Sequence, residues 1–324
     1  MKDDSIGIDI SKDHLDAHRL SDGAAARFAN SAAGFRALAK WLGADIPARV
    51  VYEPTGPYHA AFERRFAGNL ALCKVNPLQA RRFAQSKGTR AKTDQVPSRG
   101  LRANRCRAMD ARMLAQMGVA LALEPDAPLS QSQRDLKELQ VARMALVKDK
   151  TRLKNRLQTL ILAFTLKQAK ARLTLILRQL SDIEAEINAC IAQDGATAHK
   201  RQILTSIPGI GAVTAATILI ECPEVGNMTG KQIASLSGLA PMTRESGKWR
   251  GQAYIQGGRK HLRDALYMPA LVAARFNPDL KRKYQAMITA GKPPKVALTT
   301  LMRKLIELAN TLIKNDRKWL PKGA

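Results

Sequence analysis

Apolar and polar positions follow two different periods along the first hundred residues. Four short runs have the length and the β-branched or apolar character of strands, at residues 5–10, 15–20, 49–53 and 70–75. Three other stretches repeat apolar side chains at helical spacing, at residues 33–42, 58–66 and 77–85. Strands separated by helices predict an α/β sheet with crossover connections.

The pattern changes beyond residue 130, where apolar positions recur with a period near 3.5. Leucines follow one another at steps of seven, at Leu139, Leu146, Leu153 and Leu160. Further on, apolar residues alternate at steps of three and four from Leu173 to Cys190. This spacing predicts a helical hairpin or coiled coil. Its seam fits two helices of one chain as well as an interface between subunits.

The last third of the chain has the pattern of short helices. They are expected at residues 200–206, 212–220, 231–236, 261–276 and 295–313, with a polar, glycine-rich loop at 245–259. The predicted organisation is therefore an α/β domain over residues 1–128, a helical segment over 129–196 and a helical domain over 197–324.

Charge then narrows the class of partner. The chain has 53 Lys and Arg against 27 Asp and Glu, a net charge of +26. Such a surplus predicts a polyanionic partner, because each phosphate neutralised releases counterions. A membrane is disfavoured, since no apolar run reaches the roughly 18 residues of a spanning helix and the first four residues do not resemble a signal peptide. The four cysteines lack the paired spacing of a zinc site, so we expect a cytoplasmic, nucleic-acid-binding protein with reduced thiols.

Cations are concentrated between Glu53 and Asp110, where Glu63 and Asp94 are the only acids. A solvated basic face is the plain interpretation, but the one-sided excess favours a surface that follows a phosphate backbone. The candidate nucleic-acid-binding residues in this stretch are Arg81, Arg82, Lys87, Arg90 and Lys92.

Two carboxylates fall in or directly after apolar strands. Asp9 lies between Ile8 and Ile10, and Glu53 ends a predicted strand. A carboxylate in such a position costs desolvation free energy unless a partner meets it. Asp94 and Asp110, taken singly, are ordinary cap or surface acids. As a set, the four carboxylates predict a site for Mg²⁺, because acids brought together stay ionised only around a cation.

The segment Ser-Ile-Pro-Gly-Ile-Gly at residues 206–211 precedes a predicted helix. Its glycines suit either a hairpin that lets backbone N–H groups approach a phosphate or an ordinary turn between packed helices. Spacing alone does not decide between these two interpretations.

Eight short segments, taken in order, resemble the DEDD-type transposases of the insertion-sequence one-ten family, which includes the Piv-type DNA invertases. They span nearly the whole chain, at residues 6–12, 53–56, 92–94, 110–115, 207–211, 236–241, 245–247 and 262–267. The resemblance implies a RuvC-like (RNase H-like) N-terminal domain and a C-terminal transposase domain, joined by a coiled coil. It also implies tetramers built from dimers and a structured noncoding RNA, the bridge RNA, that pairs with donor and target DNA.

The resemblance assigns the chemistry to five residues. It implies that Asp9, Glu53, Asp94 and Asp110 hold Mg²⁺ and that Ser246 attacks DNA to give a covalent phosphoserine link. By itself Ser246 is a turn serine before a glycine, and a serine hydroxyl needs a base or a metal to become a nucleophile. Nearby cations are candidates to hold the scissile phosphate, or are surface charges: Lys248, Arg250, Arg259, Lys260 and Arg263.

The sequence departs from the family pattern between the third and fourth acids. The family spaces them three residues apart, whereas Asp94 and Asp110 are sixteen apart, so about thirteen residues are additional. Pro97 and Gly100 permit this stretch to loop out at modest entropic cost. We favour a working site, because both flanking motifs are intact. The alternatives are a nucleic-acid-binding protein without activity and a junction-resolving nuclease in which water attacks and the serine is idle.

Overall fold

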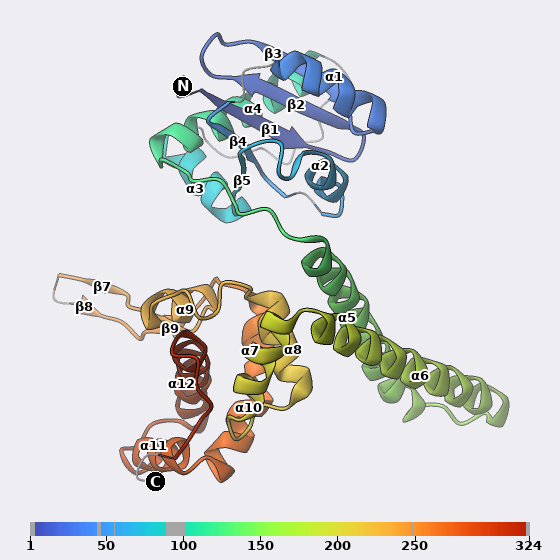
Figure 1. Cartoon of the computed structure of the whole chain (residues 1–324), viewed down its shortest axis with the longest axis vertical. Helices are drawn as coiled ribbons and strands as arrows, with labels where there is room; N and C mark the ends of the chain where they lie inside the picture. Colours follow the sequence, from blue (N-terminus) through green and yellow to red (C-terminus); the bar gives the residue numbers. More distant parts are fainter. Residues whose placement is uncertain (1–3, 44–46, 55, 89–100, 248, 322–324) are drawn as a thin grey trace. The chain divides into compact units, whose positions relative to one another are not determined.

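The chain forms two compact units, Met1–Leu129 and Ser130–Ala324, each described here by itself (Figure 1). The computed structural model describes residues 4–43, 47–54, 56–88, 101–247 and 249–321, and for residues 101–109 the backbone alone. The first unit therefore ends next to the predicted boundary. A separate domain for the helical segment stays a prediction.

The first unit is built on a mixed five-stranded sheet of order β3-β2-β1-β4-β5. Strands β1 and β2 run antiparallel, as do β2 and β3, while β1, β4 and β5 run parallel. The strand bounds are Ser5–Ile10, His14–Arg19, Ala25–Ala29, Arg49–Tyr52 and Leu72–Lys74. The predicted α/β sheet is confirmed. The pattern misses β3, because this edge strand buries none of its five residues.

Helices cover both faces of this sheet. On one face Ile6, Ile8 and Ile10 pack against α1 (Ala32–Leu42) and α2 (His59–Phe66). On the other face Val51 and Cys73 pack against α3 (Pro77–Ser86) and α4 (Leu101–Ala120). The sequence pattern predicts α1, α2 and α3 to within two residues at either end but does not identify α4.

Helix α4 lies so close to β1 that only glycine fits at the crossing. A Cβ atom at Gly7 would lie 1.8 Å from the carbonyl oxygen of Ala111 and 2.6 Å from the nitrogen of Ala115. Further along, the Ser5 hydroxyl donates to the carbonyl of Ala115 over 2.9 Å. Residue numbers rise along α4 as they fall along β1, so the two elements run in opposite directions.

The second unit begins with the predicted helical hairpin, formed by α5 (Gln131–Leu157) and α6 (Ala163–Gln193). Ser130 and Gln133 form a capping box at the start of α5, which satisfies backbone donors of the first turn. The heptad leucines of α5 pack against the apolar seam of α6 in two clusters that include Leu136, Leu153, Ile176 and Ile187. The seam is thus filled from within one chain.

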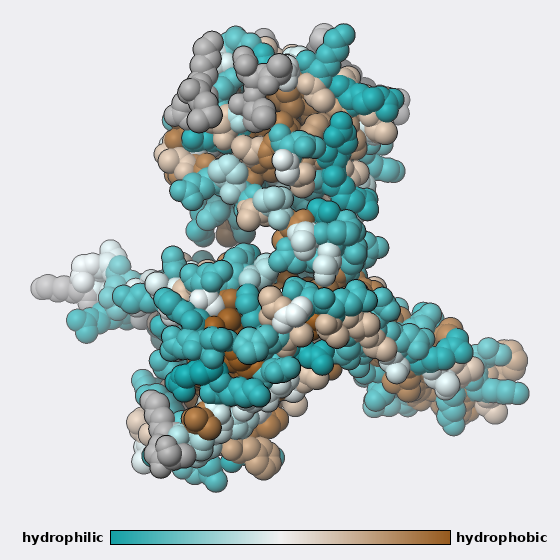
Figure 2. All heavy atoms as spheres, viewed as in Figure 1, coloured by the Kyte–Doolittle hydropathy of each residue, from teal (hydrophilic) through white to brown (hydrophobic). Residues whose placement is uncertain are grey.

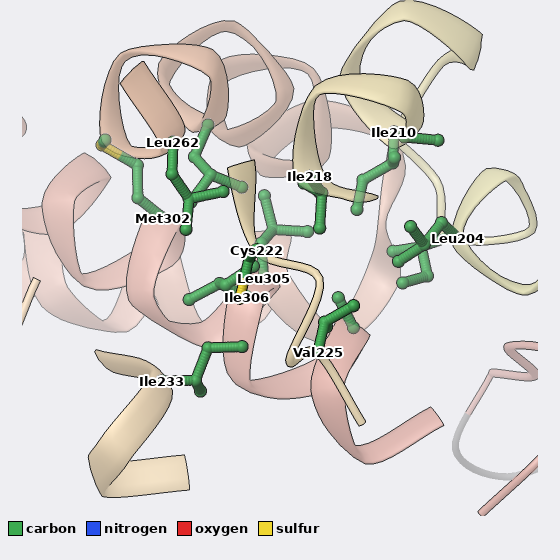
Figure 3. Close-up of a cluster of buried hydrophobic side chains, with 14 of the residues drawn as sticks. Leu204, Ile210, Ile218, Cys222, Val225, Ile233, Leu262, Met302, Leu305 and Ile306 are labelled. Atoms are coloured by element: carbon green, nitrogen blue, oxygen red, sulfur yellow. The ribbon is translucent and has the colours of Figure 1, made fainter. Parts of the chain in front are cut away.

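Six further helices form most of the rest of the second unit. Their bounds are Gly195–Thr205 (α7), Ala212–Glu221 (α8), Gly230–Leu236 (α9), Lys260–Phe276 (α10), Pro278–Thr289 (α11) and Pro294–Lys314 (α12). Figure 3 shows side chains of α7, α8, α9, α10 and α12 meeting in one core around Cys222 and Leu305. Helix α11 is not predicted, because Leu280 is its one buried residue.

The visible surface is mostly hydrophilic (Figure 2). In the described part of the chain, no helix has both the length and the apolar content needed to cross a bilayer.

The Ile-Pro-Gly-Ile-Gly segment forms the turn between α7 and α8. Ile207 and Ile210 are buried in the core of the second unit. Gly209 has φ +106°, and a Cβ there would lie 2.7 Å from the carbonyl oxygen of Pro269 in α10. Gly209 is therefore explained by packing, in agreement with the turn interpretation.

The stretch expected to be an irregular loop contains short strands instead, which corrects the sequence-based prediction. Pro241–Met242 (β6) pairs with Tyr254–Ile255 (β9), and Glu245–Ser246 (β7) pairs with Trp249–Arg250 (β8). Seven of these eight residues are exposed to solvent, and Ile255 is half-buried. Ile255 packs against the core of the second unit, but the other seven residues are exposed, so the sequence of these strands carries no period-two signal.

Replacing Gly7 by Ala is expected to destabilise the first unit by about 3 kcal/mol or more, because the added methyl group meets the backbone of α4. Hydrogen exchange of β1 and β2 peptides over a urea series measures this loss. Ala25→Ser, at an exposed position of β3, is the control and should change stability by less than about 0.5 kcal/mol. Equal stability of Gly7→Ala and the wild type would show that α4 does not pack as described.

Gly209 and Gly211 offer a matched pair within one turn. Gly209→Ala should cost about 2 kcal/mol or more, because it combines a positive φ with a backbone clash. Gly211 precedes α8 with open space around its Cα, so Gly211→Ala should cost less than about 1 kcal/mol. The measurement is the urea midpoint of the second unit. A similar midpoint for both variants would contradict the close approach of α10.

Candidate active site

Two of the predicted acids stand at the carboxyl ends of adjacent parallel strands. In the β1–β4 register, Ile8 lies opposite Tyr52, and the next residues are Asp9 and Glu53. Both carboxylates are partly buried. Because these strands end at the same edge of the sheet, the register brings two acids that are 44 positions apart in the sequence to one place.

Asp110 reaches the same edge from α4. Asp9 and Gly7 lie two residues apart on β1 and therefore share the sheet face that α4 covers. Gly7 touches Ala111, and α4 runs antiparallel to β1, so Asp110 lies toward the end of β1 that carries Asp9. Asp110 is partly buried as well. Asp94, the remaining acid of the predicted tetrad, lies outside the described residues.

The three described acids have interaction partners in the structure, but they do not form a closed ligand set. Among the described residues, no three His, Cys, Asp or Glu side chains lie close enough together to hold a metal ion. Carboxylate oxygens are nonetheless the donor type that Mg²⁺ prefers. The residue types and their common edge fit a divalent cation, whereas their present spacing leaves the site incomplete.

Asp16, a carboxylate outside the predicted tetrad, lies beside Asp9, and the sequence pattern does not identify it. It is the direct cross-strand partner of Asp9 in the β1–β2 register and is buried. Arg27 on β3 donates to both of its oxygens, over 2.7 and 3.2 Å. Hydrogen bonding to Asp16, together with the charges of Asp16 and Asp9, raises the pKa of the Arg27 guanidinium. Arg27 is therefore a fixed positive charge next to the predicted catalytic carboxylate.

The contact between Asp16 and Arg27 depends on how β2 and β3 pair, so the sequence pattern of either strand alone does not reveal it. Asp16 and Arg27 are opposite each other in the β2–β3 register, eleven residues apart in the sequence. A strand pattern read along one dimension does not reveal such a partner, because register depends on the turn between the strands.

A second ion-pair cluster lies at the end of β4. Glu63 on α2 accepts hydrogen bonds from Tyr52 and Lys74. Burial alone would raise the pKa of Glu63, but the hydrogen bonds from Lys74 and Tyr52 outweigh it and hold this pKa below its ordinary value. Burial and the neighbouring Glu63 raise the pKa of Tyr52. The positive charge of Lys74 is thus paired with Glu63 inside the first unit.

The predicted basic residues of the first unit divide into two groups. Arg81 and Arg82 on α3, and Lys87 just after it, are exposed to solvent. Arg90 and Lys92 lie outside the described residues. The exposed cations are accessible to a phosphate backbone and carry the complementary charge. Their role in nucleic-acid binding stays a prediction.

In the second unit, Ser246 lies on β7 at the end of a projecting hairpin (Figure 1). Its side chain is exposed, and the register pairs it with Trp249 on β8. Glu245 and Arg250 form the neighbouring cross-strand pair. Gly247, which follows Ser246, has φ +57°, a conformation that glycine adopts without strain. The hairpin therefore presents the hydroxyl to solvent.

The cations near Ser246 differ in how far the fold already uses them. Arg259 donates to both carboxylate oxygens of Glu224 over 2.7 Å and to the carbonyl of Glu221. Lys260 pairs with Asp264, and Arg263 donates to the carbonyl of Gly257 over 2.6 Å. Arg250 is exposed, and Lys248 lies outside the described residues. Phosphate binding by these five residues stays a prediction.

Comparison with known proteins matches both parts of the chain to transposases. The family model of IS110-type DEDD transposases, described as "Transposase", matches residues 6–165, which include all four predicted acids. The model described as "Transposase IS116/IS110/IS902 family" matches residues 201–285, which include Ser246.

Individual relatives agree with these matches. The pilin gene-inverting proteins of Moraxella bovis and Moraxella lacunata are each 28% identical over 342 aligned residues, covering 96% of this chain and 96% of their own length. An uncharacterized 43.6 kDa protein of insertion element IS110 from Streptomyces coelicolor is 31% identical over 146 residues, 44% of this chain and 35% of its own length. The chain belongs to the IS110 family of DNA transposases and recombinases.

Proposed function

We propose that this transposase cuts and rejoins DNA at specific sites through a covalent serine–DNA intermediate. The carboxylates Asp9, Glu53, Asp94 and Asp110 assist the reaction, and Ser246 is the nucleophile. The observation that carries this proposal is the strand register, which puts Asp9 and Glu53 at adjacent strand ends. The mixed sheet, with acids at the carboxyl ends of its central strands, supports a RuvC-like (RNase H-like) assignment for the first unit.

A divalent cation, Mg²⁺, completes the acidic group in this proposal. It would be held by the oxygens of Asp9, Glu53, Asp110 and Asp94, and when bound it would neutralise negative charge on the scissile phosphate. The carboxylates themselves supply the negative potential that attracts the ion. The positive charge of Arg27 offsets part of that potential. Its hydrogen bonds orient the carboxylate of Asp16, which we leave out of the ligand set.

Ser246 carries the covalent step. Its Oγ attacks the phosphorus atom, an Oγ–P ester forms, and the P–O bond to the neighbouring sugar breaks. The departing sugar oxygen takes up a proton and leaves as a hydroxyl, while the serine proton passes to a base such as water or a carboxylate. Attack by a sugar hydroxyl from another strand reverses the step and rejoins DNA. The exposure of Ser246 at a hairpin tip is what a nucleophile that meets duplex DNA requires.

The additional residues between Asp94 and Asp110 affect whether Asp94, the third acid, can join the other three. Helix α4 begins at Leu101, so Asp94 precedes it by seven residues, and Asp110 lies well inside it. The position three before Asp110, where the family pattern has an acid, is Arg107. A working tetrad therefore requires residues 95–100 to bring Asp94 back toward the sheet edge.

The partners we propose are donor and target DNA, a structured noncoding guide RNA and further copies of this chain in a tetramer. The net charge of +26 and the exposed cations of α3 support nucleic-acid binding. The Moraxella relatives, aligned over 96% of their own length, are named pilin gene-inverting proteins, which supports DNA as the substrate. We assign the protein to the cytoplasm, at the nucleoid.

Neutralising single acids should slow cleavage strongly without loss of DNA binding. Asp9→Asn, Glu53→Gln, Asp94→Asn and Asp110→Asn are each expected to lower the cleavage rate by about a hundred- to a thousandfold. A chelator should do the same, and added Mg²⁺ should restore activity to the wild type only. Asp13→Asn, an exposed acid in the β1–β2 turn, is the matched control. Wild-type cleavage by Asp94→Asn alone would reduce the proposed site to three acids, and wild-type cleavage by Asp9→Asn would refute it.

Ser246→Ala should remove the protein–DNA adduct, because the attacking oxygen is lost. Denaturing gels of end-labelled DNA measure the adduct, and Ser235→Ala, at an exposed serine of α9, is the control that should retain it. An adduct that persists in Ser246→Ala contradicts the assignment of the nucleophile. Free cleaved ends without any adduct in the wild type would instead indicate a nuclease in which water attacks.

A further inference from the structure

The hairpin that carries Ser246 also carries an aromatic side chain that the proposed chemistry leaves unexplained. Trp249 on β8 is 60% exposed, although burying an indole of this size is strongly favourable. It is the direct cross-strand partner of Ser246, so both side chains lie on the same face of the hairpin. Directly opposed residues have Cβ atoms roughly 5 Å apart.

The indole ring is held against the hairpin instead of extending freely into solvent. A Cβ atom at Gly251 would lie 2.5 Å from Cη2 and 2.9 Å from Cζ3 of Trp249. Gly251 therefore leaves room for the outer end of the ring, and its own N–H donates to the carbonyl of Arg244 over 2.8 Å. One side of the ring is supported by backbone, and the exposed remainder is available to a partner.

The surroundings of Trp249 favour a nucleic acid over an apolar protein surface. Between residues 241 and 255 the chain has Arg244, Lys248 and Arg250 against the single acid Glu245. The Arg244 guanidinium stacks over the ring of Tyr254, 5.5 Å from its centroid. An aromatic ring among cations is the combination that binds unstacked bases together with their phosphates.

We propose that Trp249 is a stacking site for the nucleobase next to the scissile phosphate, and that it holds the unstacked strand in place beside Ser246. This inference rests on the proposed DNA chemistry but adds a binding site to it. Stacking on the indole orients the nucleotide, while Arg250 contacts its phosphate. Because each base has an aromatic face, this contact tolerates any sequence.

The test is equilibrium binding of a 20-nucleotide single-stranded DNA that contains 2-aminopurine, measured with Ser246→Ala protein in chelator so that no cleavage occurs. Trp249→Ala and Trp249→Leu should weaken binding roughly 5- to 150-fold and abolish quenching of 2-aminopurine, whereas Trp249→Phe should stay within about threefold of the parent. Phe276→Ala, at a 71% exposed aromatic on α10, is the control and should change nothing.

Salt dependence separates stacking from charge. Trp249→Ala should lower affinity without changing the slope of log K against log salt, while Arg250→Ala should reduce that slope by about one contact. Unchanged affinity of Trp249→Ala, a wild-type affinity for Trp249→Leu, or an effect confined to an RNA oligonucleotide of the same sequence would overturn the inference. Because the assay needs no catalysis, failure of the Ser246 assignment would leave its result unaffected.

Discussion

The close packing of helix α4 on strand β1 is the contact on which the proposed catalytic site depends. Gly7 permits the backbone of Ala111 to approach to a distance that no side chain allows. The hydrogen bond from Ser5 to Ala115 fixes the same helix one turn later. With α4 held at these points, Asp110 is directed to the strand ends that carry Asp9 and Glu53. β1 ends at Ile10 and α4 begins at Leu101, so two elements separated by 90 residues of chain define one edge.

Negative charge at this edge of the sheet is partly compensated by a cation of the first unit. Asp9 and Asp16 are cross-strand neighbours, and two adjacent carboxylates repel unless a cation compensates them. Arg27 supplies part of that compensation through its hydrogen bonds to Asp16 and its attraction to Asp9. Arg27 thereby fixes Asp16 on the neighbouring strand, next to the carboxylate that we propose as a metal ligand. In the second unit the corresponding side chains are not buried: Ser246 and Trp249 are exposed on a hairpin, and the cations near them lie at the surface.

Most elements that bury an apolar stripe were predictable from the sequence; α4 is the exception, since it buries Ala111, Leu114 and Met117 but was not predicted. Strand β1 and helices α1, α5 and α6 bury regular stripes. The pattern predicts β1 and α1 to within two residues at either end, and α5 with α6 as one hairpin. Strand β3, helix α11 and the β6–β9 hairpins bury little, so their formation depends on pairing and neighbours. For the site, Asp9 and Glu53 were visible as acids in apolar strands. Asp16 and Trp249 were not, because their significance comes from cross-strand register.

The most direct test of the account is a crystal structure of the full chain bound to DNA in the presence of Mn²⁺, with the ion located by its anomalous scattering. A Mn²⁺ peak is expected roughly 2.0–2.3 Å from carboxylate oxygens of Asp9, Glu53 and Asp110. A Mn²⁺ ion bound at this edge without Asp110, or an α4 displaced from Gly7 in the complex, would contradict it.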